Sequence, residues 1–186
     1  MLVSALVERE CEGVYAAARL TLDDCPSIAQ LIERIMGARP VLADGGPEAG
    51  TRRIGSVWSV TVRRDLSGPR MRWVAGVELA RWWLPRYGAI MFSRETIRRL
   101  ASAILVPRET FLDALEERGD MPAPLAEVFG TQQALTLLRL GETTGRPVAL
   151  LDEPHHLITL RGHRSYRPRW IRIQLTDDLR VGMMAR

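Results

Sequence analysis

Residues 57–85 have the sequence VWSVTVRRDLSGPRMRWVAGVELARWWLP, and this stretch decides the fold. From Val57 to Arg64 apolar and polar side chains alternate, which is typical of a strand with one buried face. The predicted buried face carries Trp58, Val60 and Val62. The turn Ser67-Gly68-Pro69 follows, and apolar residues at helical spacing then predict a helix from Arg70 to Leu84, ended by Pro85. The stretch is therefore a strand that turns into a helix.

Helical patterns surround this unit, and strands follow near the C-terminus. The expected helices are Met1–Arg19, one capped by Ser27 and Gln30 and ended by Gly37, one capped by Ser93, one from Pro107 to Gly119, and two short helices divided at Phe129-Gly130-Thr131. Further strands are expected at 148–151, 157–160 and 170–175. Asp44–Gly50 is expected to be a flexible loop and Met121–Pro124 a proline-rich connector. The predicted fold class is α+β, mainly helical with a small sheet.

Length and composition favour one globular domain. The chain has 186 residues, of which 46% are hydrophobic and 26% charged. No apolar run reaches the roughly 20 residues that cross a bilayer, so we expect a cytoplasmic protein with no membrane partner. The only cysteines, Cys11 and Cys25, do not form a disulfide framework. The net charge is +4 and all 26 basic residues are arginine, which favours acidic partners.

Three stretches in this order resemble the ImmA/IrrE family of metallopeptidases. They are the strand and helix of 57–84, the stretch Glu95–Pro107 and the stretch Leu125–Leu140. The resemblance implies a zincin-like fold, with the family's active-site helix at 72–84 and an acidic metal ligand supplied near the start of 95–107. It also implies one domain over 1–186: a degenerate metallopeptidase-like core at 1–120, a helix-turn-helix-like subdomain at 121–147, and C-terminal strands at 148–186.

The zinc-binding residues of that family are missing. A zincin helix carries His-Glu-x-x-His, which places two imidazoles one turn apart on one metal ion. The matching stretch is Val77-Glu78-Leu79-Ala80-Arg81, and valine and arginine offer no lone pair to zinc. Glu78 keeps the position of the general base, whereas Arg94 falls at the third-ligand position and Glu95 is one residue away. We therefore expect no catalytic zinc, no cofactor and no peptidase activity.

Arg81 can close the degenerate site in place of a metal. Glu78 and Arg81 have the i,i+3 spacing of a helical ion pair, and Glu95 could join them. The alternative is a surface arginine lying over Trp82. The three histidines, His155, His156 and His163, have no nearby residue that completes a tetrahedral metal site, so we expect turn or strand roles for them.

Two segments fit nucleic-acid binding. Pro124–Leu140 has the pattern of a helix-turn-helix, in which exposed Gln132, Gln133 and Arg139 would contact DNA. We favour the alternative, two packed helices that complete the core, because the second helix has one basic residue and DNA affinity rests on several phosphate contacts. The densest basic and aromatic cluster comprises Arg161, Arg164, Tyr166, Arg167, Arg169, Trp170 and Arg172. That cluster could bind nucleic acid, bind an acidic protein face, or protect a strand edge.

The main functional hypothesis is a non-catalytic regulatory protein that binds a protein partner. Relatives in the resembling family act on helix-turn-helix repressors, often in mobile elements or stress responses, so a repressor is the partner that the resemblance implies. One alternative is a DNA-binding transcriptional regulator that uses residues 124–140 and the arginine-rich C-terminal region. Another is an active metallopeptidase with a rebuilt metal site. No nucleophile elbow, phosphate loop or dinucleotide fingerprint favours another enzyme class.

Overall fold

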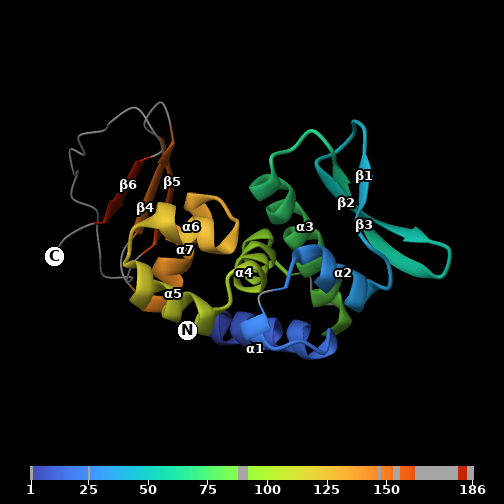
Figure 1. Cartoon of the computed structure of the whole chain (residues 1–186), viewed down its shortest axis with the longest axis horizontal. Helices are drawn as coiled ribbons and strands as arrows, with labels where there is room; N and C mark the ends of the chain where they lie inside the picture. Colours follow the sequence, from blue (N-terminus) through green and yellow to red (C-terminus); the bar gives the residue numbers. More distant parts are fainter. Residues whose placement is uncertain are drawn as a thin grey trace.

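The structure, a computed structural model, describes residues 2–24, 26–87, 92–145, 148–152, 156–161 and 180–183. These residues form a mainly helical α+β protein with seven α-helices and two three-stranded sheets (Figure 1). The helices are α1 (Leu2–Ala17), α2 (Ile28–Met36), α3 (Gly68–Trp83), α4 (Arg94–Leu105), α5 (Arg108–Arg118), α6 (Pro122–Phe129) and α7 (Gln133–Thr144). The strands are β1 (Val41–Ala43), β2 (Ala49–Ile54), β3 (Val57–Arg63), β4 (Val148–Asp152), β5 (His156–Arg161) and β6 (Arg180–Met183).

Local signals set most helix ends where the sequence predicts them. The Ser27 hydroxyl accepts a hydrogen bond from the Gln30 backbone N–H at 3.2 Å, and the Gln30 side chain accepts one from the Ser27 backbone N–H at 2.9 Å. Gly37 ends α2 with a φ of +93°, a conformation that glycine adopts at little cost. The Ser93 hydroxyl caps α4 by accepting from the Thr96 N–H at 3.1 Å. These ends need only neighbouring residues, which explains why the sequence predicts them.

Proline positions differ slightly from the prediction. Helix α3 begins at Gly68 instead of Arg70, with Pro69 in its first turn, and its last residue, Trp83, leads into a 3-10 turn that contains Pro85. The expected connector at Met121–Pro124 is the start of α6, because Pro122 occupies the first helical position, where a missing N–H costs no hydrogen bond.

The first sheet, in the order β1-β3-β2, is larger than the single strand predicted. β1 pairs with β3 in parallel, and β2 forms an antiparallel hairpin with β3 through the two-residue turn Gly55-Ser56, in which Gly55 has a φ of +60°. The predicted loop Asp44–Gly50 is therefore too long, since Ala49 and Gly50 already belong to β2.

The face assignment of β3 is wrong at two residues. Val60 and Val62 are buried as predicted, but Trp58 is 41% exposed. Ser59, predicted on the solvent face, is fully buried, and its hydroxyl donates a 2.6 Å hydrogen bond to the Arg39 carbonyl. The segment between α2 and β1 covers that end of the strand and supplies an acceptor for the serine.

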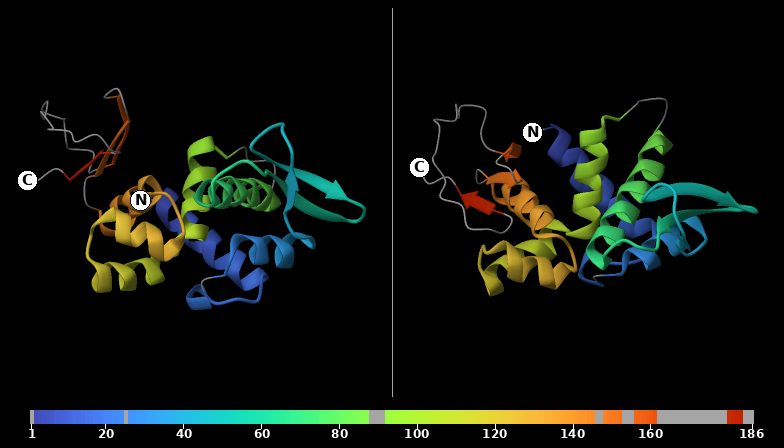
Figure 2. Two further views of the ribbon diagram at one scale, coloured as in Figure 1. Left: turned by 45° about the horizontal axis from the view of Figure 1, so that its top comes forward. Right: turned by 90° about the horizontal axis from the view of Figure 1, so that it is seen from above.

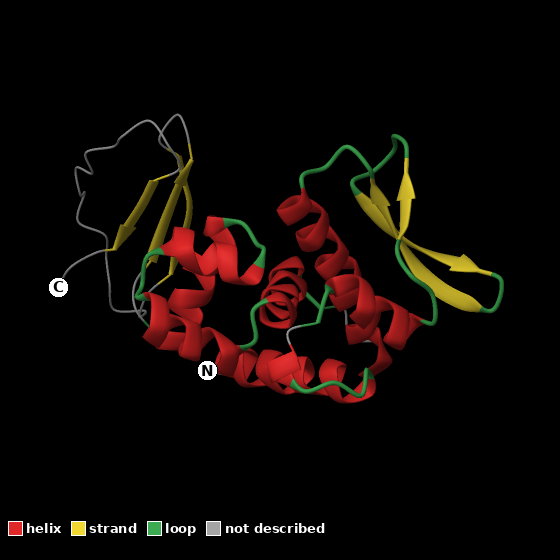
Figure 3. Cartoon of the chain, viewed as in Figure 1, coloured by secondary structure: helices red, strands yellow, loops and turns green. Residues whose placement is uncertain are grey.

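Helix α4 connects two hydrophobic cores. The larger core joins α1, α2, α3, α4 and β3; the smaller joins the end of α4 with α5, α6, α7 and β4. Helix α3 packs against the sheet on one side and against α4 on the other (Figure 3). Gly76 permits this close approach, because a Cβ there would lie 3.1 Å from Leu105 Cδ1. The Tyr15 hydroxyl donates to the Ile104 carbonyl at 2.9 Å and fixes α1 against α4.

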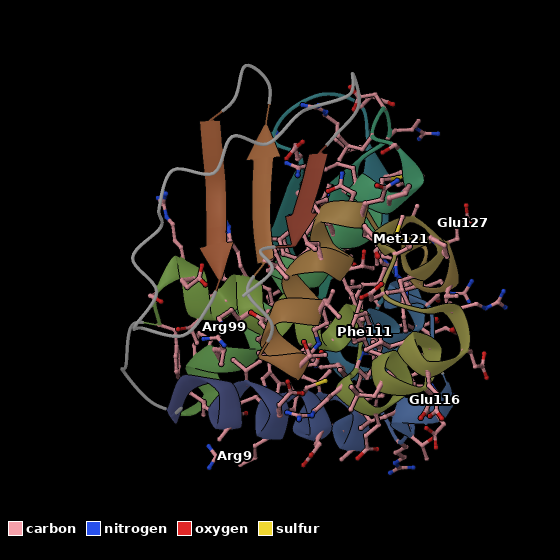
Figure 4. The ribbon with its side chains drawn as sticks, turned by 90° about the vertical axis from the view of Figure 1, so that its left-hand side faces the viewer. Arg9, Arg99, Phe111, Glu116, Met121 and Glu127 are labelled. Atoms are coloured by element: carbon pink, nitrogen blue, oxygen red, sulfur yellow. The ribbon has the colours of Figure 1, made fainter. Side chains whose placement is uncertain are left out.

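The smaller core is centred on aromatic side chains. The rings of Phe111 on α5 and Phe129 on α6 have centroids 6.0 Å apart. Phe111 lies near the middle of the view in Figure 4, whereas Glu116 and Glu127 project outward from α5 and α6. Gly130, with a φ of +56°, ends α6 and turns the chain into α7.

The second sheet has the antiparallel order β5-β4-β6, and it lies at the opposite end of the molecule from the first (Figure 2). The predicted strands at 148–151 and 157–160 are confirmed as β4 and β5, and β6 was not predicted. The predicted strand at 170–175 lies outside the described residues. None of the helices in the described part of the chain combines the length and apolarity that a bilayer crossing requires.

Candidate functional site

One face of α3 lines a pocket. Its lining residues on this helix recur at alternating steps of three and one, which places them in a single stripe: Arg70, Trp73, Val74, Val77, Glu78 and Arg81. The stripe faces a cavity of about 590 Å³ that is closed on one side by Glu48 and Ala49 at the start of β2, and on the other by Arg94, Ile97 and Arg98 of α4. Val77, Glu78 and Arg81, which the sequence analysis singled out, therefore line one pocket.

Glu78 is the buried anion of this pocket. Its side chain is 7% exposed, and its Oε1 lies 2.7 Å from Arg81 Nη1, so the predicted ion pair is present. The Thr51 hydroxyl of β2 donates to Glu78 Oε2 at 3.0 Å, a contact that the sequence did not predict. Arg81 remains 59% exposed, so it covers the carboxylate from the solvent side. Both carboxylate oxygens already accept a hydrogen bond or ion pair, which suits an anchoring role.

A second ion pair closes the rim beside β2. Arg70 donates to both oxygens of Glu48, from Nε to Oε1 at 3.1 Å and from Nη2 to Oε2 at 2.6 Å. This bidentate hydrogen bonding lowers the pKa of Glu48 below its ordinary value of 4.5 and raises the pKa of Arg70. Both groups are therefore charged across the physiological pH range.

Helix α4 adds two cations to the opposite wall. Arg94 and Arg98 are exposed, line the pocket one turn apart, and form no ion pair with another residue that the structure describes. Glu95, expected to join Glu78 and Arg81, is exposed and is not among the lining residues. The residue of α4 that lines the pocket at this point is Arg94.

Within the described residues, no group of three or more His, Cys, Asp or Glu side chains has the geometry to hold a metal ion. Val77 is half-buried in the pocket wall, and its side chain has no donor atom for a metal. His156 begins β5, and His155 and His163 lie outside the described residues.

The prediction that Arg139 is exposed is wrong. Arg139 is 1% exposed; its Nε donates to the Val106 carbonyl at 2.8 Å, and its Nη1 and Nη2 contact the two Glu8 carboxylate oxygens at 2.7 and 2.9 Å. Gln132 and Gln133 are exposed, as predicted. Arg139 is the only basic residue between Met121 and Gly145, so α6 and α7 present no exposed cation to a phosphate backbone.

The other predicted binding cluster cannot be placed. Arg161 is the last residue of β5, and its side chain is not described. The remaining members lie outside the described residues: Arg164, Tyr166, Arg167, Arg169, Trp170 and Arg172.

Comparison with known proteins gives a structural match. No protein-family model matches this sequence, and no curated protein matches it. A solved structure of a Mycobacterium tuberculosis transcriptional regulator superposes with a TM-score of 0.58. The likeness is one of fold. Sequence identity is 16%, and the superposition covers 83% of this chain and 54% of the regulator, so the present chain spans about half of that protein's length.

Proposed function

We propose that this chain is a non-catalytic, metallopeptidase-like regulatory domain that acts by binding a protein partner. The observation that carries the proposal is that both carboxylate oxygens of Glu78 already contact other side chains. A zincin glutamate must be free to accept a proton from metal-bound water. Here its oxygens contact Arg81 and Thr51, and Val77 takes the place of an imidazole. The same helix and pocket are retained, but the groups that hydrolysis needs are replaced by a closed ion pair.

Two considerations support a role in transcription control. A solved structure with a similar fold is named a transcriptional regulator. The ImmA/IrrE resemblance, which rests on 57–84, 95–107 and 125–140, points to helix-turn-helix repressors as partners. A domain that keeps the binding surface and loses hydrolysis would regulate such a repressor stoichiometrically, by occupying it.

Complementation in the native host tests this proposal. We expect a strain that lacks the gene to show altered transcript levels, and a Glu78→Gln variant to restore them as well as the native protein does. Glutamine keeps an oxygen acceptor for Thr51 but cannot act as a general base. Glu116→Gln, at an exposed position on α5, is the matched control. If Glu78→Gln folds, accumulates normally and behaves like the deletion, the Glu78 carboxylate is essential for function and the non-catalytic proposal loses its support.

Direct DNA binding is the second candidate, and the fold likeness to a transcriptional regulator favours it. Because Arg139 is buried, this candidate relies on the arginine-rich region beyond β5 for its phosphate contacts. Anisotropy of a labelled duplex tests this. DNA binding predicts affinity that falls by orders of magnitude between about 50 and 200 mM salt, because phosphate contacts release counterions. Salt-independent or absent binding excludes it.

A further inference from the structure

The pocket over α3 has more positive charge than its own carboxylates neutralise. Among the residues that the structure describes, four arginines and two glutamates line it. Arg70 is paired with Glu48, and Arg81 with Glu78. Arg94 and Arg98 add two charges that no described residue pairs. The lining therefore carries a local surplus of two positive charges facing a concave space.

The spacing of the two surplus cations, Arg94 and Arg98, costs free energy. Arg94 and Arg98 are four residues apart on α4, which places both guanidinium groups on one helix face. Like charges at this spacing destabilise a helix, and an anion held between them removes the repulsion. Guanidinium groups also match carboxylate and phosphate oxygens in geometry. The arrangement is thus better suited to a bound anion than to an empty pocket.

The rest of the wall is apolar. Ile97 lies between the two arginines in sequence and lines the same cavity, and Trp73, Val74 and Val77 line it from α3. Trp73, Val77 and Ile97 are half-buried, so each keeps surface that a ligand could cover. A volume of about 590 Å³ lies within the range of small-molecule sites, which is roughly 300–1,000 Å³.

We propose that this pocket binds a small organic anion, with a phosphate or carboxylate held by Arg94 and Arg98 and an apolar body against Trp73, Val77 and Ile97. The inference rests on the proposed function in one respect, since it takes the pocket to be free of metal. It adds a regulatory input: the ligand would lie beside the Glu78–Arg81 pair, so its binding could alter the surface that a partner contacts.

Isothermal titration calorimetry in buffer freed of metal over a chelating resin tests the proposal. The probes are phenyl phosphate and benzoate, with inorganic phosphate and phenol as the head group and the body alone. We expect saturable one-site binding of phenyl phosphate, benzoate or both, at least about tenfold tighter than inorganic phosphate because the ring buries apolar surface. Phenol should give no saturable signal. The tighter of the two aromatic probes identifies the head group.

Three variants and one control variant locate the site. Arg94→Gln and Arg98→Gln should each weaken the tighter aromatic probe by about tenfold or more, since each removes a charge-assisted hydrogen bond. Arg118→Gln, an equal change of charge at an exposed position of α5, should leave the affinity unchanged. Ile97→Ala should weaken the aromatic probe and leave inorganic phosphate unaffected. Thermal unfolding of each variant confirms that it folds.

Several results would overturn the inference. The inference fails if neither aromatic probe shows saturable binding up to about 10 mM. It also fails if the native protein and both arginine variants bind the probe with equal affinity, or if inorganic phosphate binds as tightly as the aromatic probes. The proposed function fails by different measurements, namely loss of complementation by Glu78→Gln or zinc bound beside Glu78. Failure of one inference is therefore distinguishable from failure of the other.

Discussion

Replacing Arg139 by methionine should lower the free energy of unfolding by about 2–5 kcal/mol, because it removes the buried partner of an ion pair. Methionine fills the space of the aliphatic part of the arginine side chain, so the effect comes mainly from the lost contacts of the guanidinium group. Arg139 connects α7 to Glu8 on α1 and to the Val106 carbonyl at the end of α4. Three helices therefore depend on one guanidinium group.

The contributions can be estimated contact by contact. Val106 is fully buried, so its carbonyl would lose the 2.8 Å hydrogen bond from Arg139 with no water to replace it. Leaving this acceptor unpaired costs about 1–3 kcal/mol. Glu8 would lose two charge-assisted bonds, but its side chain is 25% exposed, so water compensates in part and leaves a cost of about 1–2 kcal/mol. Glu142 keeps its 3.0 Å pair with Arg99 and loses only a longer contact to Arg139 of 3.6 Å.

Urea unfolding followed by far-ultraviolet circular dichroism measures this loss, and Arg118→Met at an exposed position of α5 is the control. Glu8→Gln should cost less in the Arg139→Met background than in the native protein, because the carboxylate is then already unpaired. A loss below about 1 kcal/mol for Arg139→Met would refute the reasoning, since it would mean that the side chain is solvated in the folded protein.

Further predictions follow from the other polar groups. Burial raises the pKa of the Cys11 thiol from 9.0 to about 12, so in a Cys25→Ser background it should resist a thiol reagent at pH 8 until the protein is denatured. Because the unfolded thiol ionises near pH 9 and the folded thiol does not, the free energy of unfolding should fall as pH rises from 9 toward 12. Ser27→Ala should lower the free energy of unfolding by about 1 kcal/mol in the same urea assay, since it removes the cap of α2. Arg70→Gln should return the pKa of Glu48 toward 4.5, measured by NMR titration of its side-chain carbons.

Features that depend on neighbours in sequence were predictable. The cap at Ser27, the glycine end at Gly37 and the Glu78–Arg81 pair each involve residues within four positions, so spacing alone determines whether they can form. The helix from 68 to 83 was predicted to within two residues at each end for the same reason.

Features that depend on tertiary packing were not predictable from the sequence. Arg139 has a charge that indicates the surface, and only the positions of Glu8 and the Val106 carbonyl make its burial favourable. The strand β2 was missed because glycine and arginine obscure its pattern, although the Gly55-Ser56 turn was a usable hairpin signal. The sequence also contained a signal for the two pocket cations, since Arg94, Ile97 and Arg98 share one helix face.

Anomalous diffraction at the zinc absorption edge, from crystals soaked in zinc, tests the central claim most directly. We expect no anomalous peak within coordinating distance of Glu78, and an Arg81–Glu78 pair that stays near 2.7 Å. A zinc peak beside Glu78, with Arg81 displaced and a coordination position open to water, would contradict the account and identify an active metal site.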